Sequence, residues 1–104
     1  MRPVAILGIG QTQNGVHWDK SLRESGGEAA FAAMHDAGGE TVDALFVGNM
    51  LSSTISGQNQ LGAFFSDWIG LWKQEAVKVE AACASGAAAL RAGLMAVSAG
   101  ELDS

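Results

Sequence analysis

The order of apolar segments along the chain predicts an α/β fold with a mainly parallel sheet. Three short apolar runs, at residues 4–9, 42–48 and 76–80, have the length and the branched or aromatic side chains that are typical of strands. Each run is followed by a longer stretch with helical spacing or helical composition. Because a strand, helix, strand unit joins parallel strands by a right-handed crossover, this order predicts three mainly parallel strands connected by crossover helices.

The first predicted strand and helix occupy the N-terminal third of the chain. Val4–Ile9 (VAILGI) is a continuous apolar run, which suits a strand buried on both faces. A helix is predicted over about Ser21–Ala37, because apolar residues recur there at helical spacing until Gly38 and Gly39 interrupt the pattern. The polar residues between the two segments predict a loop.

The middle of the chain predicts a second strand, a loop and a second helix. The strand is Val42–Gly48 (VDALFVG), the loop is the serine-rich stretch Leu51–Gly57, and the helix lies within Leu61–Trp72. The aromatic face of this helix consists of Phe64, Phe65, Trp68 and Trp72. We expect these side chains to pack on the sheet, and a partner surface is the alternative.

The last predicted strand leads into an unusually apolar helix. Ala76–Glu80 (AVKVE) alternates apolar and charged residues, and the alanine-rich segment that follows contains a single charge, Arg91. Since a helix that is apolar all round is normally buried, we expect a mostly buried third helix with its body at Ala84–Ala99. If it is buried, Arg91 needs a carboxylate or carbonyl partner, and we assign it a structural role.

Size, composition and charge limit the classes of partner. The 104 residues, 48% of them hydrophobic and 16% charged, match one small domain that is apolar for its size, so part of its surface is expected to face another layer or subunit. The formal net charge is −5 and the acidic residues are scattered. No basic stripe exists that would follow a phosphate backbone, so we expect no nucleic-acid partner.

The single cysteine and the apolar segments bear on the compartment. One cysteine excludes an internal disulfide, and its free thiol is preserved in a reducing compartment, which favours the cytoplasm. The apolar run Val4–Ile9 is too short for the core of a signal peptide. The stretch Ala81–Ala99 approaches the length of a membrane span, but alanine and glycine dominate it and Ser85, Arg91 and Ser98 interrupt it, so no membrane association is expected.

Two patterns that suggest cofactor or metal sites fail on their spacing. Gly8, Gly10 and Gly15 lie at the end of the first predicted strand and just after it, but the dinucleotide-binding fingerprint requires its third glycine at position 13, which is Gln13. The two histidines, His17 and His35, show no metal-ligand spacing. We therefore expect neither a bound nucleotide nor a metal site, and we expect both histidines to lie on the surface.

Cys83 is the candidate catalytic residue. It lies where the third predicted strand turns into the third helix, and in parallel α/β units reactive groups commonly occupy such turns. The positive end of the helix dipole favours the thiolate form, which is the nucleophile toward a thioester carbonyl. The neighbouring side chains are small, which leaves room for a substrate; they are Ala82, Ala84, Ser85, Gly86 and Ala87. The alternative is an inert packing cysteine, since free cysteines are often buried.

The residues around Cys83 carry a family resemblance. The string Val79–Leu90 (VEAACASGAAAL) resembles the nucleophile motif of thiolases, particularly the archaeal and sterol-carrier-protein-like branches. Val4–Thr12 resembles the first strand and loop of that family, and Val42–Leu51 resembles its second strand and the start of a connection that helps to build the dimer. Gly57-Gln58 falls within the same connection, and Ala99–Asp103 resembles the end of the family's buried helix. The resemblance therefore covers nearly the whole chain.

The resemblance implies a cysteine-dependent acyl-CoA C-acyltransferase. Cys83 would accept the acyl group from an acyl-CoA thioester, its backbone N–H would be one oxyanion donor, and a carbanion from a second acyl-CoA would attack the acyl-enzyme in a reversible Claisen condensation. Coenzyme A thioesters would be substrates, and no other cofactor is implied. The runner-up is a related condensing enzyme, either a ketoacyl synthase or a hydroxymethylglutaryl-CoA synthase.

The family's activating histidine, in a glycine-histidine-proline motif, and its further acid/base cysteine do not occur in residues 1–104. The resemblance therefore implies an incomplete thiolase N-terminal domain spanning 1–104. Alone it is expected to behave as an inactive binding or assembly fragment, with partners that are a second copy or the remainder of the enzyme.

Overall fold

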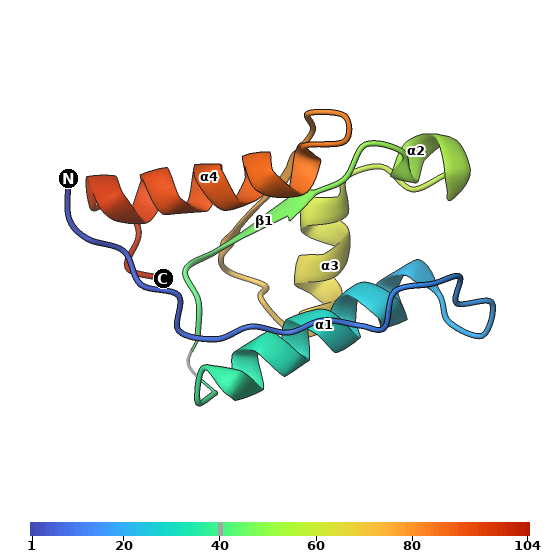
Figure 1. Cartoon of the computed structure of the whole chain (residues 1–104), viewed down its shortest axis with the longest axis horizontal. Coiled ribbons are helices and arrows are strands. Elements are labelled where there is room, and N and C mark those ends of the chain that lie inside the picture. Colours follow the sequence, from blue (N-terminus) through green and yellow to red (C-terminus); the bar gives the residue numbers. More distant parts are fainter. Residues whose placement is uncertain (40) are drawn as a thin grey trace.

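A computed structural model describes residues 1–39 and 41–104. Its elements in chain order are α1 (Leu22–Asp36), β1 (Ala44–Gly48), α2 (Ser52–Ile55), α3 (Leu61–Ile69), β2 (Glu75–Val79) and α4 (Ser85–Ala99), as labelled in Figure 1. The two strands pair in parallel, from Ala44 opposite Glu75 to Gly48 opposite Val79. The predicted α/β class and the parallel pairing of the second and third predicted strands are confirmed.

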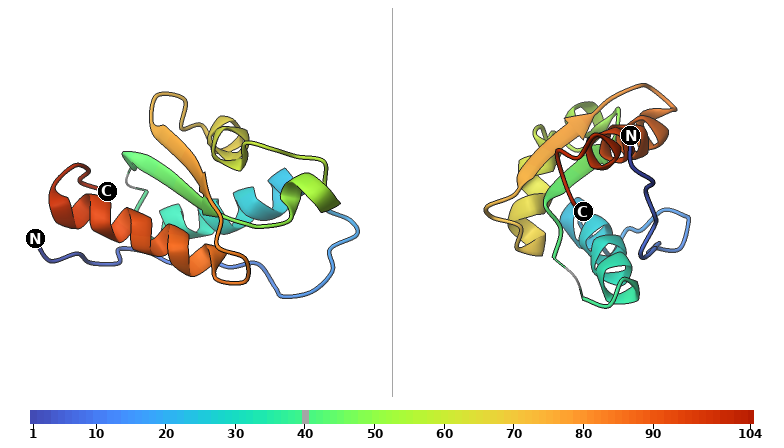
Figure 2. Two further views of the ribbon diagram at one scale, coloured as in Figure 1. Left: turned by 90° about the horizontal axis from the view of Figure 1, so that it is seen from above. Right: turned by 90° about the vertical axis from the view of Figure 1, so that its left-hand side faces the viewer.

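The elements form layers around this two-stranded sheet. Helix α4 packs on one face, mainly along β1, while α3 packs on the other face and α1 lies against α3 (Figures 1 and 2). Small residues allow close contact at both faces: a Cβ on Gly62 of α3 would lie 2.7 Å from the backbone nitrogen of Val77, and a Cβ on Gly93 of α4 would meet the ring of Phe46 at 3.4 Å. The most enclosed apolar side chains are Leu61, Ile69, Leu71 and Ala89.

Helix α1 begins and ends close to the predicted bounds. Ser21 is its N-cap, and its hydroxyl accepts a hydrogen bond from the Glu24 backbone N–H at 3.2 Å. The Glu24 carboxylate accepts in return from the Ser21 N–H at 2.7 Å. This reciprocal capping box satisfies two donors that would otherwise lack intrahelical partners. After the C-cap Ala37, Gly38 and Gly39 both have positive φ, as the predicted helix stop requires.

Aromatic side chains of α3 contact α1, a neighbour that the expectation of packing on the sheet did not include. A Cβ on Gly26 of α1 would collide with the ring of Phe65, so the absence of a side chain there makes room for that ring. The Arg23 guanidinium carbon lies 4.8 Å from the Phe64 ring centroid and 5.3 Å from that of Trp68, a cation–π arrangement. The helix ends at Gly70 with φ 84°, so Trp72 lies outside it and is 78% exposed.

The prediction of a strand at Val4–Ile9 is wrong, and within residues 1–39 and 41–104 the sheet has two strands rather than three. The chain here is bonded to helices: just before the segment the Arg2 N–H donates to the Ser98 carbonyl at 3.0 Å, and at its end the Ile9 N–H donates to the Asp36 carboxylate at 2.9 Å. A Cβ on Gly8 would lie 2.5 Å from the Ala37 nitrogen, so this backbone rests directly on α1. Bound at both ends to helices, the segment does not pair with β1.

The loop predicted at Leu51–Gly57 contains the short helix α2, which is a second difference. The Asn49 side-chain oxygen accepts hydrogen bonds from the N–H groups of Leu51 at 3.0 Å and Ser52 at 2.8 Å. A side-chain acceptor placed just before these residues satisfies the first free donors of a helical turn. Four residues suffice for the turn, and Gly57 with φ 63° ends it.

The third difference concerns α4, which is not mostly buried. Only Ser85, Ala89 and Ser98 are buried in it, while Leu90 is 63% exposed and Arg91 is also exposed. One face packs on β1, and no element of residues 1–39 and 41–104 covers the other face. By length and composition alone, the 18-residue stretch Ala82–Ala99 would be able to cross a membrane, a test that core helices of soluble proteins also pass.

Candidate functional site

Cys83 lies in the turn between β2 and α4, as predicted. The strand ends at Val79, Ala84 is the N-cap of the helix, and the helix begins at Ser85. Cys83 is a free cysteine and is exposed, so the alternative of an enclosed packing cysteine does not hold in this structure. In Figure 1 this turn is the orange loop at the start of α4. The thiol is therefore open to a substrate that approaches the C-terminal end of the strands.

The turn that carries Cys83 has an uncommon backbone conformation. Ala82, immediately before the cysteine, has φ 48°, in the left-handed region that residues with a Cβ rarely adopt. Two backbone hydrogen bonds close the turn, from the Ala84 N–H to the Ala81 carbonyl at 2.9 Å and from the Ser85 N–H to the Ala82 carbonyl at 3.1 Å. These bonds form a tight turn with Cys83 at its apex.

Ser85 ties the same turn together with its side chain. Its hydroxyl accepts a hydrogen bond from the Ala81 N–H at 2.9 Å and donates one to the Ala82 carbonyl at 2.6 Å. The residue is only 4% exposed. Sequence reasoning treated Ser85 as one of several small neighbours and missed these bonds. The available signal was a hydroxyl residue two positions after the cysteine, at the first helical position.

The end of β1 packs against the start of α4, next to this turn. A Cβ added to Gly48 would overlap the Ser85 carbonyl oxygen and would lie 2.6 Å from the Ser85 carbonyl carbon and 2.7 Å from the Gly86 Cα. The first turn of α4 therefore lies directly on the backbone of Gly48, which only glycine permits. Asn49 follows and donates its N–H to the Val79 carbonyl at 3.2 Å, which joins the ends of both strands next to the turn.

The structure does not bring either histidine to Cys83. His17 lies in the loop before α1 and is hydrogen-bonded through Nε2 to the Gln13 carbonyl at 2.6 Å. His35 is exposed in the last turn of α1, and because α1 and α4 run in the same direction, it lies at the end of the molecule away from the start of α4 (Figures 1 and 2). Within residues 1–39 and 41–104, no three His, Cys, Asp or Glu side chains gather in a metal-binding group.

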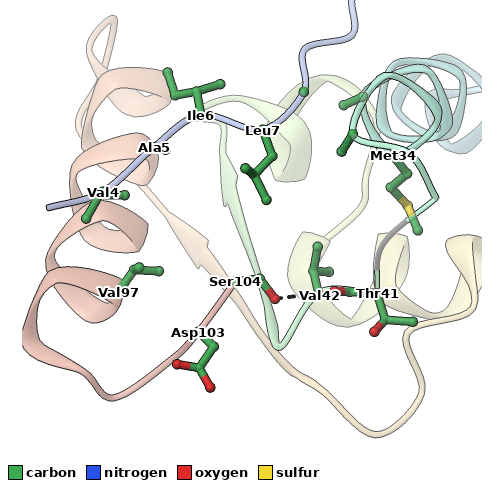
Figure 3. Close-up of a pocket in the computed structure, with 13 residues that line it drawn as sticks. Val4, Ala5, Ile6, Leu7, Met34, Thr41, Val42, Val97, Asp103 and Ser104 are labelled. Carbon is green, nitrogen blue, oxygen red and sulfur yellow. Dashed lines mark hydrogen bonds between the residues drawn. The ribbon is translucent and has the colours of Figure 1, made fainter. Parts of the chain in front are cut away.

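One apolar cavity lies away from Cys83. It has a volume of about 300 Å³ and opens between the N-terminal segment, the end of α1 and the residues just before β1 (Figure 3). Its walls include Leu7, Met34, Val42 and Val97, and Ser104 closes one side by donating its hydroxyl to the Thr41 carbonyl at 3.3 Å. The cavity therefore lies at the N-terminal end of β1, whereas Cys83 follows the C-terminal end of β2. Five strand residues at about 3.3 Å each put roughly 16 Å between those ends, so this cavity is not an acyl pocket for Cys83.

Comparison with known proteins places this geometry in a family. The sequence model described as "Thiolase, N-terminal domain" matches residues 5–104. The chain is 44% identical over 105 aligned positions to an acetyl-CoA acetyltransferase of Methanothermobacter thermautotrophicus and 40% identical to one of Methanocaldococcus jannaschii. Both alignments cover 99% of this chain and 27% of the relative, so the chain spans about a quarter of the length of the curated relatives it matches. With Cys83 exposed at the turn into α4 and the family match spanning nearly every residue, the chain belongs to the thiolase family, within its N-terminal domain.

Proposed function

We propose that this chain supplies the acyl-accepting cysteine of a thiolase-type acyl-CoA C-acyltransferase. The observation that carries the proposal is the position of Cys83: an exposed thiol on a tight turn between a parallel strand and a long helix, inside the region that matches the family. The two archaeal relatives are named acetyl-CoA acetyltransferases, which supports an acyl-CoA as the substrate class. Coenzyme A thioesters would be the substrates.

The chemistry requires two transfers at one sulfur. The Cys83 thiolate attacks the thioester carbonyl, a new carbon–sulfur bond forms, and coenzyme A leaves as a thiolate that takes up a proton. A second acyl-CoA, deprotonated at its α-carbon, then attacks the acyl-Cys83 carbonyl, which forms the carbon–carbon bond and releases the Cys83 thiolate. N–H groups at the start of α4 would stabilise the oxyanion of each tetrahedral intermediate.

Covalent trapping tests the proposal. The full-length protein that the gene encodes is incubated with radiolabelled acetyl-CoA. The reaction is quenched in acid, the protein is digested, and the labelled peptide is identified by mass spectrometry. The label is expected on the peptide containing Cys83, which is the only cysteine in these 104 residues. Cys83→Ser is the control and should lose both the label and acyl transfer while unfolding at nearly the same denaturant concentration. A label that persists in Cys83→Ser would refute the nucleophile.

The related condensing enzymes are distinguished by substrate and direction. A ketoacyl synthase would accept an acyl group from a carrier protein, and a hydroxymethylglutaryl-CoA synthase would condense without cleaving a 3-ketoacyl-CoA. We therefore expect the protein to cleave acetoacetyl-CoA with free coenzyme A, and to do so without a carrier protein. Residues 1–104 alone are expected to show no turnover, because the family's activating histidine motif does not occur in them.

We also propose that the protein forms a homo-oligomer and works in the cytoplasm. The exposed apolar side chains of α4, namely Leu90 at 63%, Leu94 at 47% and Met95 at 45%, support association through this helix, either with a second copy or with other parts of the enzyme. An exposed free thiol favours a reducing compartment. Light scattering of the purified protein should give at least twice the mass of one chain, and a mass of one chain would contradict the oligomer.

A further inference from the structure

The hydroxyl of Ser85 is placed to act on Cys83 through the backbone. Ser85 is buried, at 4% exposure, and its hydroxyl makes two hydrogen bonds: it accepts from the Ala81 N–H at 2.9 Å and donates to the Ala82 carbonyl at 2.6 Å. Both partners lie immediately before Cys83. One side chain therefore holds the peptide groups that flank the Ala81–Ala82 pair, and the second of these leads directly into Cys83.

Ser85 does not act as an ordinary helix cap. A capping hydroxyl belongs to the N-cap residue and accepts from an N–H further along the helix. Here the N-cap is Ala84, which makes no side-chain hydrogen bond, while Ser85 is the first helical residue and its bonds point back to the residues before the cysteine. The hydroxyl stabilises the turn rather than the helix end.

The turn needs such a constraint because of Ala82. Its φ of 48° lies in a region that is disfavoured for any residue with a Cβ, and such conformations persist only where the surroundings hold them. The backbone of Gly48 limits the movement of Ser85 from the opposite side. The two are so close that a Cβ on Gly48 would lie 2.6 Å from the Ser85 carbonyl carbon. The backbone of β1 thus fixes the position of Ser85, and the Ser85 hydroxyl fixes the conformation of the turn.

We infer that Ser85 is a positioning residue for acyl transfer, whose hydroxyl fixes the direction of the Cys83 sulfur and backbone N–H by clamping Ala81 and Ala82. The inference rests on the proposed role of Cys83 as nucleophile. Without the hydroxyl, the Ala81 N–H loses its partner and the Ala82 carbonyl keeps only the bond from the Ser85 N–H. The cysteine then samples orientations in which the sulfur and the oxyanion donors are no longer directed at the same carbonyl carbon. Misplacement of a reacting group by about 1 Å reduces rates by about 100-fold.

The test compares alanine substitutions of two buried serines in the same helix. Both are made in the full-length protein that the gene encodes. Ser85→Ala is expected to lower kcat for acetoacetyl-CoA cleavage by about 10- to 100-fold while KM changes less than about threefold. Ser85→Thr, which retains the hydroxyl, should recover most of the rate. Ser98→Ala is the matched control, because Ser98 is 5% exposed and its hydroxyl donates to the Arg2 carbonyl at 3.1 Å, at the far end of α4. It should leave kcat unchanged.

The outcomes separate this inference from the proposed function. If the original protein forms no acyl-Cys83, the nucleophile assignment fails whatever Ser85 does. If acyl-Cys83 forms and Ser85→Ala retains the kcat of Ser98→Ala, the positioning role is wrong and the nucleophile stands. If Ser85→Ala does not fold, the same substitution is made in an Ala82→Gly background, where glycine tolerates the left-handed conformation. The double variant is then compared with Ala82→Gly alone. Equal kcat in that pair would overturn the inference.

Discussion

Replacing Gly48 by alanine should damage both the stability of the protein and the geometry at Cys83. The added Cβ would lie 2.6 Å from the Ser85 carbonyl carbon and 2.7 Å from the Gly86 Cα, whereas ordinary contact is 3.4–4 Å. The end of β1 and the start of α4 must therefore separate by about 1 Å to reach normal van der Waals distance. The obstructing atoms are backbone atoms, which cannot rotate away as the end of a flexible side chain would.

The magnitude follows from overpacking of an enclosed contact, which costs about 1–3 kcal/mol, and the backbone obstruction at Gly48 places the expected loss in the upper half of that range. For a urea m-value of about 2 kcal/mol/M, a loss of 2 kcal/mol lowers the unfolding midpoint by about 1 M. The assay is a urea titration followed by circular dichroism at 222 nm, paired with the rate of Cys83 alkylation by iodoacetamide in native buffer. We expect a lower midpoint and a changed alkylation rate.

Gly86→Ala provides the control in the same contact region. No atom lies within 4 Å of a Cβ at Gly86, and the residue is helical, so alanine should stabilise the protein by about 0.5–1 kcal/mol through helix propensity. The two substitutions thus have opposite expected signs although their sites touch. If Gly48→Ala unfolds at the midpoint of the original protein, the close approach of β1 to α4 is not as the structure shows it, and the account of the Cys83 turn is refuted with it.

Two further substitutions test the packing and the capping of the helices. Ala89→Leu should lower the free energy of unfolding by about 1–3 kcal/mol, because Ala89 is 6% exposed where α4 meets the sheet. Ala87→Leu, on the exposed side of the same helix, should change the urea midpoint little. Equal midpoints for the two variants would contradict the orientation of α4. Ser21→Ala should cost about 1 kcal/mol by removing the side-chain cap of α1, and Ser21→Asp should restore most of it, as measured by thermal unfolding. A Ser21→Ala variant as stable as Ser21→Asp would show that the capping box contributes nothing.

Local sequence signals predicted those elements whose boundaries depend on nearby residues. The capping pair Ser21 and Glu24 and the glycines after Ala37 set the ends of α1, and the structure places that helix within one residue of the predicted bounds at each end. The strand preceding Cys83 and the helix following it were likewise predicted from consecutive residues, the first from its alternation of apolar and charged residues and the second from its alanine-rich, nearly uncharged composition. For Cys83 this gave the correct position, in an exposed turn between the two elements.

The contacts between distant segments needed the tertiary structure. The run Val4–Ile9 has the composition of a buried strand, yet composition does not say which backbone will pair with it. Here Ser98 bonds to Arg2 just before the run and Asp36 bonds to Ile9 at its end, and the run does not pair with β1. The burial of α4 depends in the same way on which surfaces reach it, so its uniformly apolar sequence gave the wrong expectation for this chain.

The turn that carries Cys83 shows both contributions at one site. The sequence by itself determined that a cysteine flanked by small residues follows a strand and precedes a helix, because those are local patterns, and the string around it carried the resemblance that the comparisons then bore out at family level. Only the tertiary structure decided that Gly48 lies beneath the start of α4 and that the Ser85 hydroxyl holds the peptides before Cys83. The physical reason is that a strand 37 positions earlier in the chain meets Ser85 only after the sheet and α4 have packed, and no local preference of either residue encodes that contact.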